Sequence, residues 1–325
     1  MHALLIRNPV AGRKWSRRQL PDAIGQLEAG GWTVEVADTQ TQHDARDFAY
    51  QAAIDGYDVV VAAGGDGTIN EVANGLLKAG EEGDLNTALG ILPAGTANVL
   101  ARDLGLNVPL PGGTKTLRYT ASQLLHAQVI DIDVGLATSN DRRQIFTCWA
   151  GIGLDAAITA HVMAYPDLKK RLGPLLFGIS ALYQVRRINN APLYTVKVDN
   201  ETWQNQAVLT VASNIQHYAV ILDMAPKASL VDGLLDVAFF QATDAFSMLK
   251  VLWLLRSGQH IDEPGVRYAR AARVEITCET PQPIHLDAEP FGTSPVTLEI
   301  IPQALPLLIP TGSASGSLTS PGPNG

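Results

Sequence analysis

The chain has few cysteines and no long apolar run. Only Cys148 and Cys278 occur among its 325 residues, and two cysteines so far apart give neither a disulfide framework nor the ligand spacing of a metal site. No apolar run reaches about 18 residues, so we expect no transmembrane helix. The N-terminus also lacks the ordered charged segment, apolar core and cleavage site of a signal peptide. A reduced, cytoplasmic protein is the simplest interpretation.

An excess of positive charge is missing as well. The chain has 24 Lys and Arg against 32 Asp and Glu, and the formal net charge of −8 argues against a nucleic-acid partner. Its composition, 46% apolar and 17% charged, is that of a globular protein. The length is sufficient for two domains, each with a sizeable core.

The sequence is organised around a glycine turn. The apolar run 59–63 ends in Gly64-Gly65-Asp66-Gly67-Thr68, and apolar residues at helical spacing begin at Ile69. This order predicts a buried strand, a turn and the start of a helix. Glycines permit close approach of a ligand and positive φ angles, and the free amides of a helix start favour an anion such as phosphate. Asp66, among those amides, is placed to hold a metal or to orient a hydroxyl group.

Strands and helices alternate in the first part of the chain. The predicted strands are 3–6, 33–37, 58–62 and 88–92, and the predicted helices are 15–29, 44–55, the one that follows the glycine turn to 78, and one from 99. This order is typical of an α/β fold with a doubly wound parallel sheet. Ligands of such sheets bind at the carboxyl ends of the strands, where three glycine-bearing loops lie. For each loop taken alone, an ordinary strand-to-helix turn is the alternative.

The pattern changes near residue 128, after a short predicted helix over 115–126. Short β-rich segments separated by Gly, Asn and Asp then predict an antiparallel β domain. They are 129–134, 145–149, 193–198, 207–212, 235–240, 274–277 and 296–300, and helices over 174–188 and 245–257 interrupt them. We therefore expect domains over 1–127 and 128–300, with residues about 301–310 packing back on the first. A low-complexity tail over 311–325 is expected to be disordered.

Three motifs occur in order in the first part: Asn8-Pro9-Val10-Ala11-Gly12, the glycine turn extended to Glu71, and Pro93-Ala94-Gly95-Thr96-Ala97-Asn98 running into Ala101-Arg102. Together they resemble the catalytic domain of diacylglycerol and sphingosine kinases, most closely the soluble bacterial lipid kinases of that family. The resemblance covers about residues 3–305 and continues through 131–135, 151–155, 232–236 and 287–290. It implies an N-terminal nucleotide-binding α/β domain, a C-terminal sandwich-like lipid domain, and ATP and Mg²⁺ in the cleft between them.

The resemblance and the loops together give the candidate nucleotide-binding residues. Backbone atoms of the glycines would line the phosphates, while threonine hydroxyls and an asparagine add polar groups. The set is Asn8, Gly12, Thr41 (with Thr39 as its alternative), Gly64, Gly65, Gly67, Thr68, Gly95 and Thr96. NAD kinases and phosphofructokinases have a similar glycine-aspartate motif, so the series of motifs is more specific than any one of them.

The resemblance also assigns catalytic roles. Glu289 matches the family's Asp-Gly-Glu motif, and its carboxylate would act as general base toward the lipid hydroxyl or bind it through a water. Asp66 and Asp133 would complete a carboxylate–water–Mg²⁺ network, with Asp131 as the alternative to Asp133. Ala288 stands where the family usually has glycine, so a positive φ there would strain the loop.

A second, structural Mg²⁺ is implied at Asp232, held together with carbonyl groups such as that of Leu234. Ser229 stands where some relatives have lysine, so this metal site is open to alteration. An Asp-Gly pair between two strands is also the ordinary signature of a hairpin turn, which is the alternative interpretation.

Two apolar segments are candidates for lipid access. Residues 168–187 lie between basic clusters and suit either an anionic bilayer surface or a core helix. Residues 248–255, with Trp253, favour a core position. We expect a cytoplasmic lipid kinase with transient membrane-surface contact, no nucleic-acid partner and room for a homodimer. Diacylglycerol is the default acceptor, with sphingoid bases, ceramide and phosphatidylglycerol open. An NAD kinase and a catalytically silent regulator are the rival interpretations.

Overall fold

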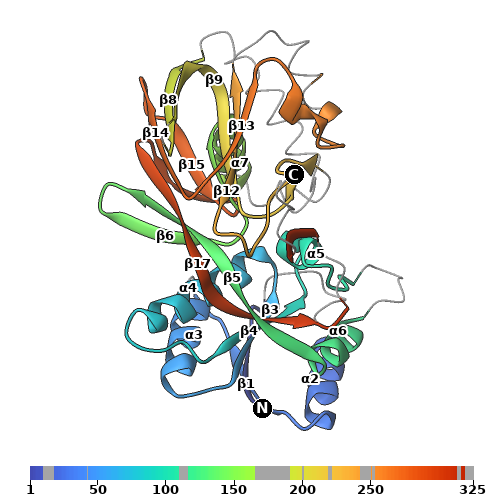
Figure 1. Ribbon diagram of the computed structural model, residues 1–325. Helices are drawn as coiled ribbons and strands as arrows, with labels where there is room; N and C mark the ends of the chain where they lie inside the picture. The colour runs from blue at the N-terminus through green and yellow to red at the C-terminus, as the bar shows by residue number, and fades with distance from the viewer. Residues whose placement is uncertain are drawn as a thin grey trace. The chain divides into compact units, whose positions relative to one another are not determined.

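The computed structural model describes residues 1–9, 18–41, 43–109, 116–164, 191–199, 201–218, 222–241, 250, 253–312 and 316–318. The chain forms two compact units (Figure 1). The first comprises Met1–Val134, Ser229–Asp232 and the chain from Pro302, and the second comprises Gly135–Ala228 and Gly233–Ile301. The expected helix 174–188 and most of the expected helix 245–257 lie outside the described residues.

The first unit is built on a parallel sheet. Its strands, in the spatial order β17-β4-β3-β1-β2, are the end of β17 (Val296–Pro310), β4 (Ala88–Pro93), β3 (Val59–Gly64), β1 (His2–Arg7) and β2 (Thr33–Asp38). The helices are α2 (Leu20–Ala29), α3 (Asp44–Ile54), α4 (Asp66–Gly80), α5 (Val99–Asp103) and α6 (Leu117–Leu124). Figure 1 shows α3 and α4 on one side of the sheet, and α2 and α6 on the other. The predicted doubly wound α/β class is confirmed.

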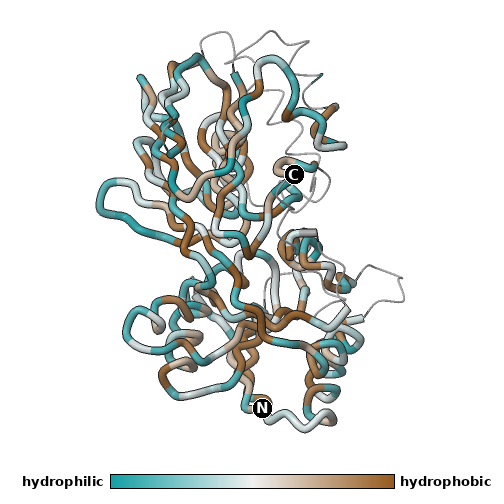
Figure 2. The backbone as a smooth tube through the Cα atoms, viewed as in Figure 1, coloured by the Kyte–Doolittle hydropathy of each residue, from teal (hydrophilic) through white to brown (hydrophobic). Residues whose placement is uncertain are grey.

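The central strands of this sheet are buried on both faces. Every residue of β3 and of β4 is buried, as expected for a parallel strand that is covered by helices on both sides. Figure 2 shows hydrophobic residues concentrated along these strands. Close helix packing adds to the core, because a Cβ atom on Gly75 of α4 would lie 2.2 Å from the Arg46 carbonyl oxygen of α3. Because these strands are parallel, the carboxyl ends of β1 to β4 share one edge of the sheet.

The second unit is antiparallel. Its strands are β6 (Arg142–Phe146), β7 (Trp149–Gly153), β8 (Leu193–Val198), β9 (Glu201–Ser213), β12 (Leu235–Gln241), β13 (Val266–Ala271), β14 (Arg273–Cys278), β15 (Pro283–Leu286) and β16 (Glu289–Thr293), with the short pair β10 (His217–Tyr218) and β11 (Leu222–Asp223). The described residues also form α7 (Leu154–Met163) and the 3₁₀ helix η2 (Gln259–Asp262). Their aromatic core includes Phe146, Tyr194, Trp203, Phe239 and Phe291. The predicted β-rich domain is confirmed.

Several boundaries differ from those expected. The strand β5 (Ala127–Ser139) begins at the expected boundary, but its residues up to Val134 belong to the first unit. The expected strand 145–149 is divided between β6 and β7. Within the tail expected to be disordered, residues 316–318 form the 3₁₀ helix η3, because the Ser317 carbonyl accepts a hydrogen bond from the Leu230 backbone amide at 2.7 Å. Among the described residues, no helix is long and apolar enough to cross a membrane.

Candidate functional site

Two of the glycine loops contact each other at the carboxyl edge of the parallel sheet. Gly65 is the N-cap of α4, and the backbone amides of Ala94 and Gly95 both donate to the Gly64 carbonyl oxygen at 2.9 Å. A Cβ atom on Gly95 would lie 2.3 Å from the Gly65 Cα atom and 2.9 Å from its nitrogen. Because Gly65 has φ of −100°, the requirement for glycine here is this close approach and not the positive φ that the sequence also allowed.

Asp66 links the same two loops through its side chain. Its Oδ1 accepts the backbone amides of Val99, at 2.6 Å, and Leu100, at 3.3 Å, which begin α5. Asn98 fixes the second loop from within, since its Oδ1 accepts the Gly95 amide and its Nδ2 donates to the Gly95 carbonyl, both at 3.0 Å. Asn98 belongs to the third sequence motif, but its role does not follow from the sequence because its partner is set by the conformation of the loop.

The other predicted nucleotide residues have different surroundings. Thr68 is buried, and its Oγ1 would lie 2.3 Å from a Cβ on Gly64, so its hydroxyl faces that glycine. Thr96 is exposed, and Asn8 is half-buried just after β1. Gly67 is half-buried in the first turn of α4. Gly12 lies outside the described residues.

Thr41 belongs to the same sheet edge but already has a partner. Its backbone amide donates to Asp44 Oδ2 at 2.9 Å, and its hydroxyl donates to Asp44 Oδ1. Asp44 also accepts the Gln40 amide at 2.7 Å. These hydrogen bonds, that of the Thr41 hydroxyl first, lower the pKa of the Asp44 carboxyl. Thr39, the alternative, is buried.

Asp133 lies on β5 and is completely buried. Its Oδ1 accepts the backbone amide of Gln303 at 2.8 Å, and its own amide donates to the Leu230 carbonyl at 2.7 Å. Asp133 thus connects three segments of the first unit that are far apart in the sequence. A carboxylate with such partners is held in a fixed orientation.

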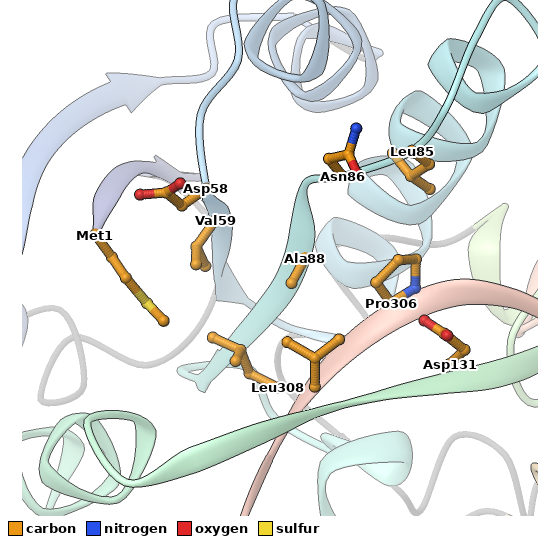
Figure 3. A pocket seen from close by; sticks show the side chains of 10 residues that line it. Met1, Asp58, Val59, Leu85, Asn86, Ala88, Asp131, Pro306 and Leu308 are labelled. Atoms are coloured by element: carbon orange, nitrogen blue, oxygen red, sulfur yellow. The ribbon is translucent and has the colours of Figure 1, made fainter.

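Asp131, the alternative to Asp133, lies elsewhere. It is exposed and lines a pocket of about 450 Å³ together with Asp58, Val59 and Ala88 (Figure 3). Those residues mark the amino ends of β3 and β4, whereas Gly64 and Gly95 mark the carboxyl ends. Asp131 therefore lines a pocket at the amino ends of these strands, and it stays the alternative to Asp133.

The predicted second metal site divides between the units. Asp232 is half-buried in the first unit, and Leu234 belongs to the second. Ser229 is buried, and its hydroxyl donates to the Ser317 carbonyl at 3.4 Å and accepts the Val231 amide at 3.3 Å, so it stabilises this segment internally. The described residues contain no group of three His, Cys, Asp or Glu side chains that could hold a metal ion. Mg²⁺ needs only one or two carboxylates with carbonyls, phosphates and water, so Asp232 fits it as a single carboxylate ligand.

Glu289 begins β16, immediately after the two-residue turn that joins it to β15. Both turn residues have positive φ, 49° at Asp287 and 66° at Ala288, so the condition for strain at Ala288 is met. The side chain of Glu289 is half-buried. Asp287 and Ala288 together therefore decide the direction in which this carboxylate leaves the turn.

Asp287 anchors the turn to the chain between β6 and β7. Its buried carboxylate accepts the backbone amides of Thr147, Cys148 and Trp149 at 2.7, 2.9 and 3.0 Å, and the Thr147 hydroxyl at 3.0 Å. Its own amide donates to the Trp149 carbonyl at 3.0 Å. These bonds explain why the expected strand 145–149 is interrupted: amides 147–149 bind a carboxylate in place of a neighbouring strand.

Comparisons with known proteins match both parts of the chain. The profile of the diacylglycerol kinase catalytic domain matches residues 2–137, and that of the YegS C-terminal NAD kinase beta sandwich-like domain matches residues 149–309. The diacylglycerol kinase of Bacillus subtilis is 27% identical over 293 residues, which are 90% of this chain and 91% of the relative. That of Staphylococcus haemolyticus is 28% identical over 90% of this chain and 83% of the relative.

Solved structures share the fold. A diacylglycerol kinase structure from Bacillus anthracis is 20% identical and superposes with a TM-score of 0.70, over 96% of this chain and 98% of that one. A second structure from the same organism is 23% identical, with a TM-score of 0.75 and the same coverage. At this level of identity the structures support the fold alone.

Proposed function

We propose that this chain, whose residues 2–137 match the diacylglycerol kinase catalytic domain, transfers the γ-phosphate of ATP to a lipid hydroxyl, with Mg²⁺ as cofactor. Diacylglycerol is the proposed acceptor and phosphatidic acid the product. The observation that carries the proposal is the contact between the loops of Gly65 and Gly95 at the carboxyl edge of the parallel sheet. Relatives named diacylglycerol kinase, similar over 90% of the chain, support the choice of lipid.

Phosphoryl transfer requires positioned phosphates, a neutralised charge and a proton acceptor. In the proposed reaction the lipid oxygen bonds to the γ-phosphorus, the bond to the β-phosphate oxygen breaks, and ADP leaves. The hydroxyl proton goes to the Glu289 carboxylate. The start of α4 at Gly65 and Asp66 offers backbone amides and the positive end of a helix dipole to the phosphates.

The carboxylates Asp66 and Asp133 would hold Mg²⁺, directly or through water. A bound Mg²⁺ supplies neutralisation of the charge on the transferred phosphoryl group. Asp66 is fixed by the amides of α5, and Asp133 by the Gln303 amide, so neither side chain has to be ordered at the moment of reaction. Asp232, with a carbonyl such as that of Leu234, would hold the second, structural ion.

The proposed location is the cytoplasm, with transient contact to a membrane surface where the lipid resides. Trp253 supports such contact, because its side chain is 69% exposed although the sequence favoured a core position. An indole ring is suited to the boundary between water and lipid. The basic segment 168–187 lies outside the described residues and stays a prediction, as does a homodimer.

An NAD kinase is the second candidate. The observation that favours it is the matched C-terminal domain, which is named for its likeness to the NAD kinase β-sandwich. The third loop, Pro93–Asn98 followed by Arg102, resembles lipid kinases instead. A catalytically silent regulator is the third interpretation, motivated by the strained alanine in the turn before Glu289.

A panel assay tests the proposal. Purified protein, labelled ATP and Mg²⁺ are incubated with diacylglycerol, a sphingoid base, ceramide, phosphatidylglycerol or NAD, and products are identified by mass. We expect phosphatidic acid from the wild type, a loss of about a hundredfold in Glu289→Gln, and wild-type turnover in Glu279→Gln, a matched change at an exposed glutamate of the same unit. Equal turnover of Glu289→Gln and wild type would remove Glu289 from the proposed base role.

A further inference from the structure

A chain of hydrogen bonds lies beneath the β15–β16 turn and has no part in the roles assigned above. It joins His285 of β15, which is 1% exposed, Asp155 in the first turn of α7, and Tyr218 of β10. His285 Nε2 lies 3.0 Å from Asp155 Oδ2, and the Tyr218 hydroxyl donates to the same oxygen at 3.1 Å. Two polar side chains, from β15 and β10, thus converge on one carboxylate oxygen of α7.

The partners of His285 determine its tautomer. Its Nδ1 accepts the backbone amide of Ala288 at 3.3 Å, and a ring nitrogen that accepts carries no proton. The ring proton is therefore on Nε2, which donates to Asp155. Burial, and next the Asp155 carboxylate, raise the pKa of Tyr218 well above its ordinary value, so the phenol stays protonated and donates to that carboxylate. Every donor in the chain has an acceptor.

The packing around this chain requires a residue without a side chain. Gly151 of β7 pairs with His285 across the sheet, and a Cβ atom on it would come within 2.1 Å of Asp155 Oδ2 and 2.4 Å of His285 Nε2. The glycine leaves the space in which the carboxylate and the imidazole meet. On the other side, the Trp149 ring lies against the Tyr218 ring with a centroid separation of 4.7 Å. Residues of β7 thus pack against the cluster at Asp155, His285 and Tyr218.

The chain of hydrogen bonds ends at Ala288, the strained residue of the turn. Ala288 has φ of 66°, a conformation that alanine disfavours, and Glu289 follows it directly. Asp287 is fixed by the amides 147–149, whereas the amide of Ala288 is fixed by His285. The two halves of the turn therefore have separate anchors, and the half next to Glu289 depends on the imidazole.

We propose that His285 is a positioning residue for Glu289: Asp155, itself bound by the Tyr218 hydroxyl, accepts the proton of His285 Nε2, and the His285 Nδ1 atom accepts the Ala288 amide so that the turn directs the Glu289 carboxylate. This role rests on the proposed function, in which Glu289 accepts the proton of the lipid hydroxyl. His285 itself touches neither substrate nor reacting atoms in this account. Its effect is on the orientation of the base.

Two substitutions distinguish the contributions of the two ring nitrogen atoms of His285. In His285→Asn the Oδ1 atom can take the place of Nδ1 and accept the Ala288 amide, while the contact with Asp155 is lost. In His285→Gln the Nε2 atom can take the place of the ring Nε2 and donate to Asp155, while the acceptor for Ala288 is lost. We expect His285→Gln to lower kcat about tenfold, His285→Asn to stay within about twofold of wild type, and KM for ATP to be unchanged in both, because the proposed nucleotide residues belong to the other unit.

The test combines these kinetics with nitrogen NMR of the wild-type protein labelled at histidine. The His285 signals are assigned by their loss in His285→Asn. The expected result is a neutral His285 with its proton on Nε2, together with the kcat order wild type, His285→Asn, His285→Gln. A proton on Nδ1, or equal kcat in the two variants, overturns the role of His285 while leaving the proposed function intact. If neither variant folds, the His285 signals are assigned in the wild type by correlation with its backbone resonances, and a proton on Nδ1 still overturns the role. A wild type that phosphorylates no lipid refutes the proposed function, and the positioning role in catalysis falls with it.

Discussion

Gly95 and Gly65 approach so closely that a methyl group on Gly95 would lie 2.3 Å from the Gly65 Cα atom. Two loops that end neighbouring parallel strands thereby form one continuous backbone surface. In the proposed kinase this surface faces the phosphates of ATP. The contact makes the geometry of each loop dependent on the other.

Gly95→Ala should separate these loops. The added Cβ meets backbone atoms, which cannot rotate away, so we expect stability to fall by about 1–3 kcal/mol and KM for ATP to rise about tenfold. Urea unfolding and steady-state kinetics measure the two effects. Gly25→Ala is the control, since its Cβ meets nothing within 4 Å in α2 and should stabilise that helix by up to about 1 kcal/mol. Unchanged KM and stability in Gly95→Ala would contradict the contact.

Asp66→Asn should abolish most of the activity and preserve the fold. The asparagine Oδ1 can still accept the amides of Val99 and Leu100, but the charge that would hold Mg²⁺ is lost. We expect turnover about a hundredfold lower, with an unfolding free energy within about 1 kcal/mol of wild type. Asp84→Asn, at an exposed position of the same unit, should have neither effect. Full turnover of Asp66→Asn at saturating Mg²⁺ would refute the metal role.

Ala288→Gly should stabilise the protein. A left-handed alanine costs about 1–2 kcal/mol, which the substitution relieves. The larger conformational freedom of glycine in the unfolded chain offsets about 0.4–1 kcal/mol of this, so we expect the free energy of unfolding to rise by roughly 0.5–1 kcal/mol. Ala160→Gly, at an exposed position of α7, is the control and should destabilise by about 1 kcal/mol. Thermal unfolding of both variants checks the sign. A loss of stability in Ala288→Gly would show that the φ of 66° stores no strain.

Stability should decline in mild acid because of His260. Burial lowers its pKa, against smaller opposing effects of the Met224 carbonyl at 3.0 Å and the carboxylates of Asp223 and Asp262. A histidine in the unfolded chain has a pKa of about 6.5. Below that pH the unfolded state binds more protons than the folded state, so the free energy of unfolding falls, by at most about 1.4 kcal/mol per pH unit. The loss levels off below the pKa of the folded state.

Urea unfolding of wild type and His260→Gln between about pH 7.5 and 5.5 measures this effect. Other titrating groups are common to the two proteins, so the difference between the two slopes belongs to His260. The wild type should lose more stability than the variant over this interval. Parallel curves would show that the buried imidazole is not the cause.

Much of the first unit follows from local pattern. The apolar run 59–63 and the glycines after it predict β3 and the start of α4, because a central parallel strand and a helix N-terminus have strong sequence signatures. The second unit was harder. The helix α7 and the strands β15 and β16 were missed, since a short helix rich in alanine and two short strands leave weak periodicity.

The surroundings of the candidate base could not be found from the sequence. Tyr218 and Asp155 are separated by 63 residues, and Asp155 and His285 by 130, and only the antiparallel topology brings them together. Sequence motifs included Asp155 and Asp287 without giving either a partner. Since the family usually has glycine at this position, the sequence indicated that a positive φ at Ala288 would strain the loop. The φ angle itself is a property of the folded turn.

A competition assay between diacylglycerol and NAD decides whether the protein phosphorylates a lipid. The wild type is given labelled ATP, Mg²⁺, diacylglycerol in mixed micelles and NAD in a single reaction, and the products are identified by mass. We expect phosphatidic acid in equal amount to the ADP formed, with no NADP. Formation of NADP without phosphatidic acid would contradict this expectation.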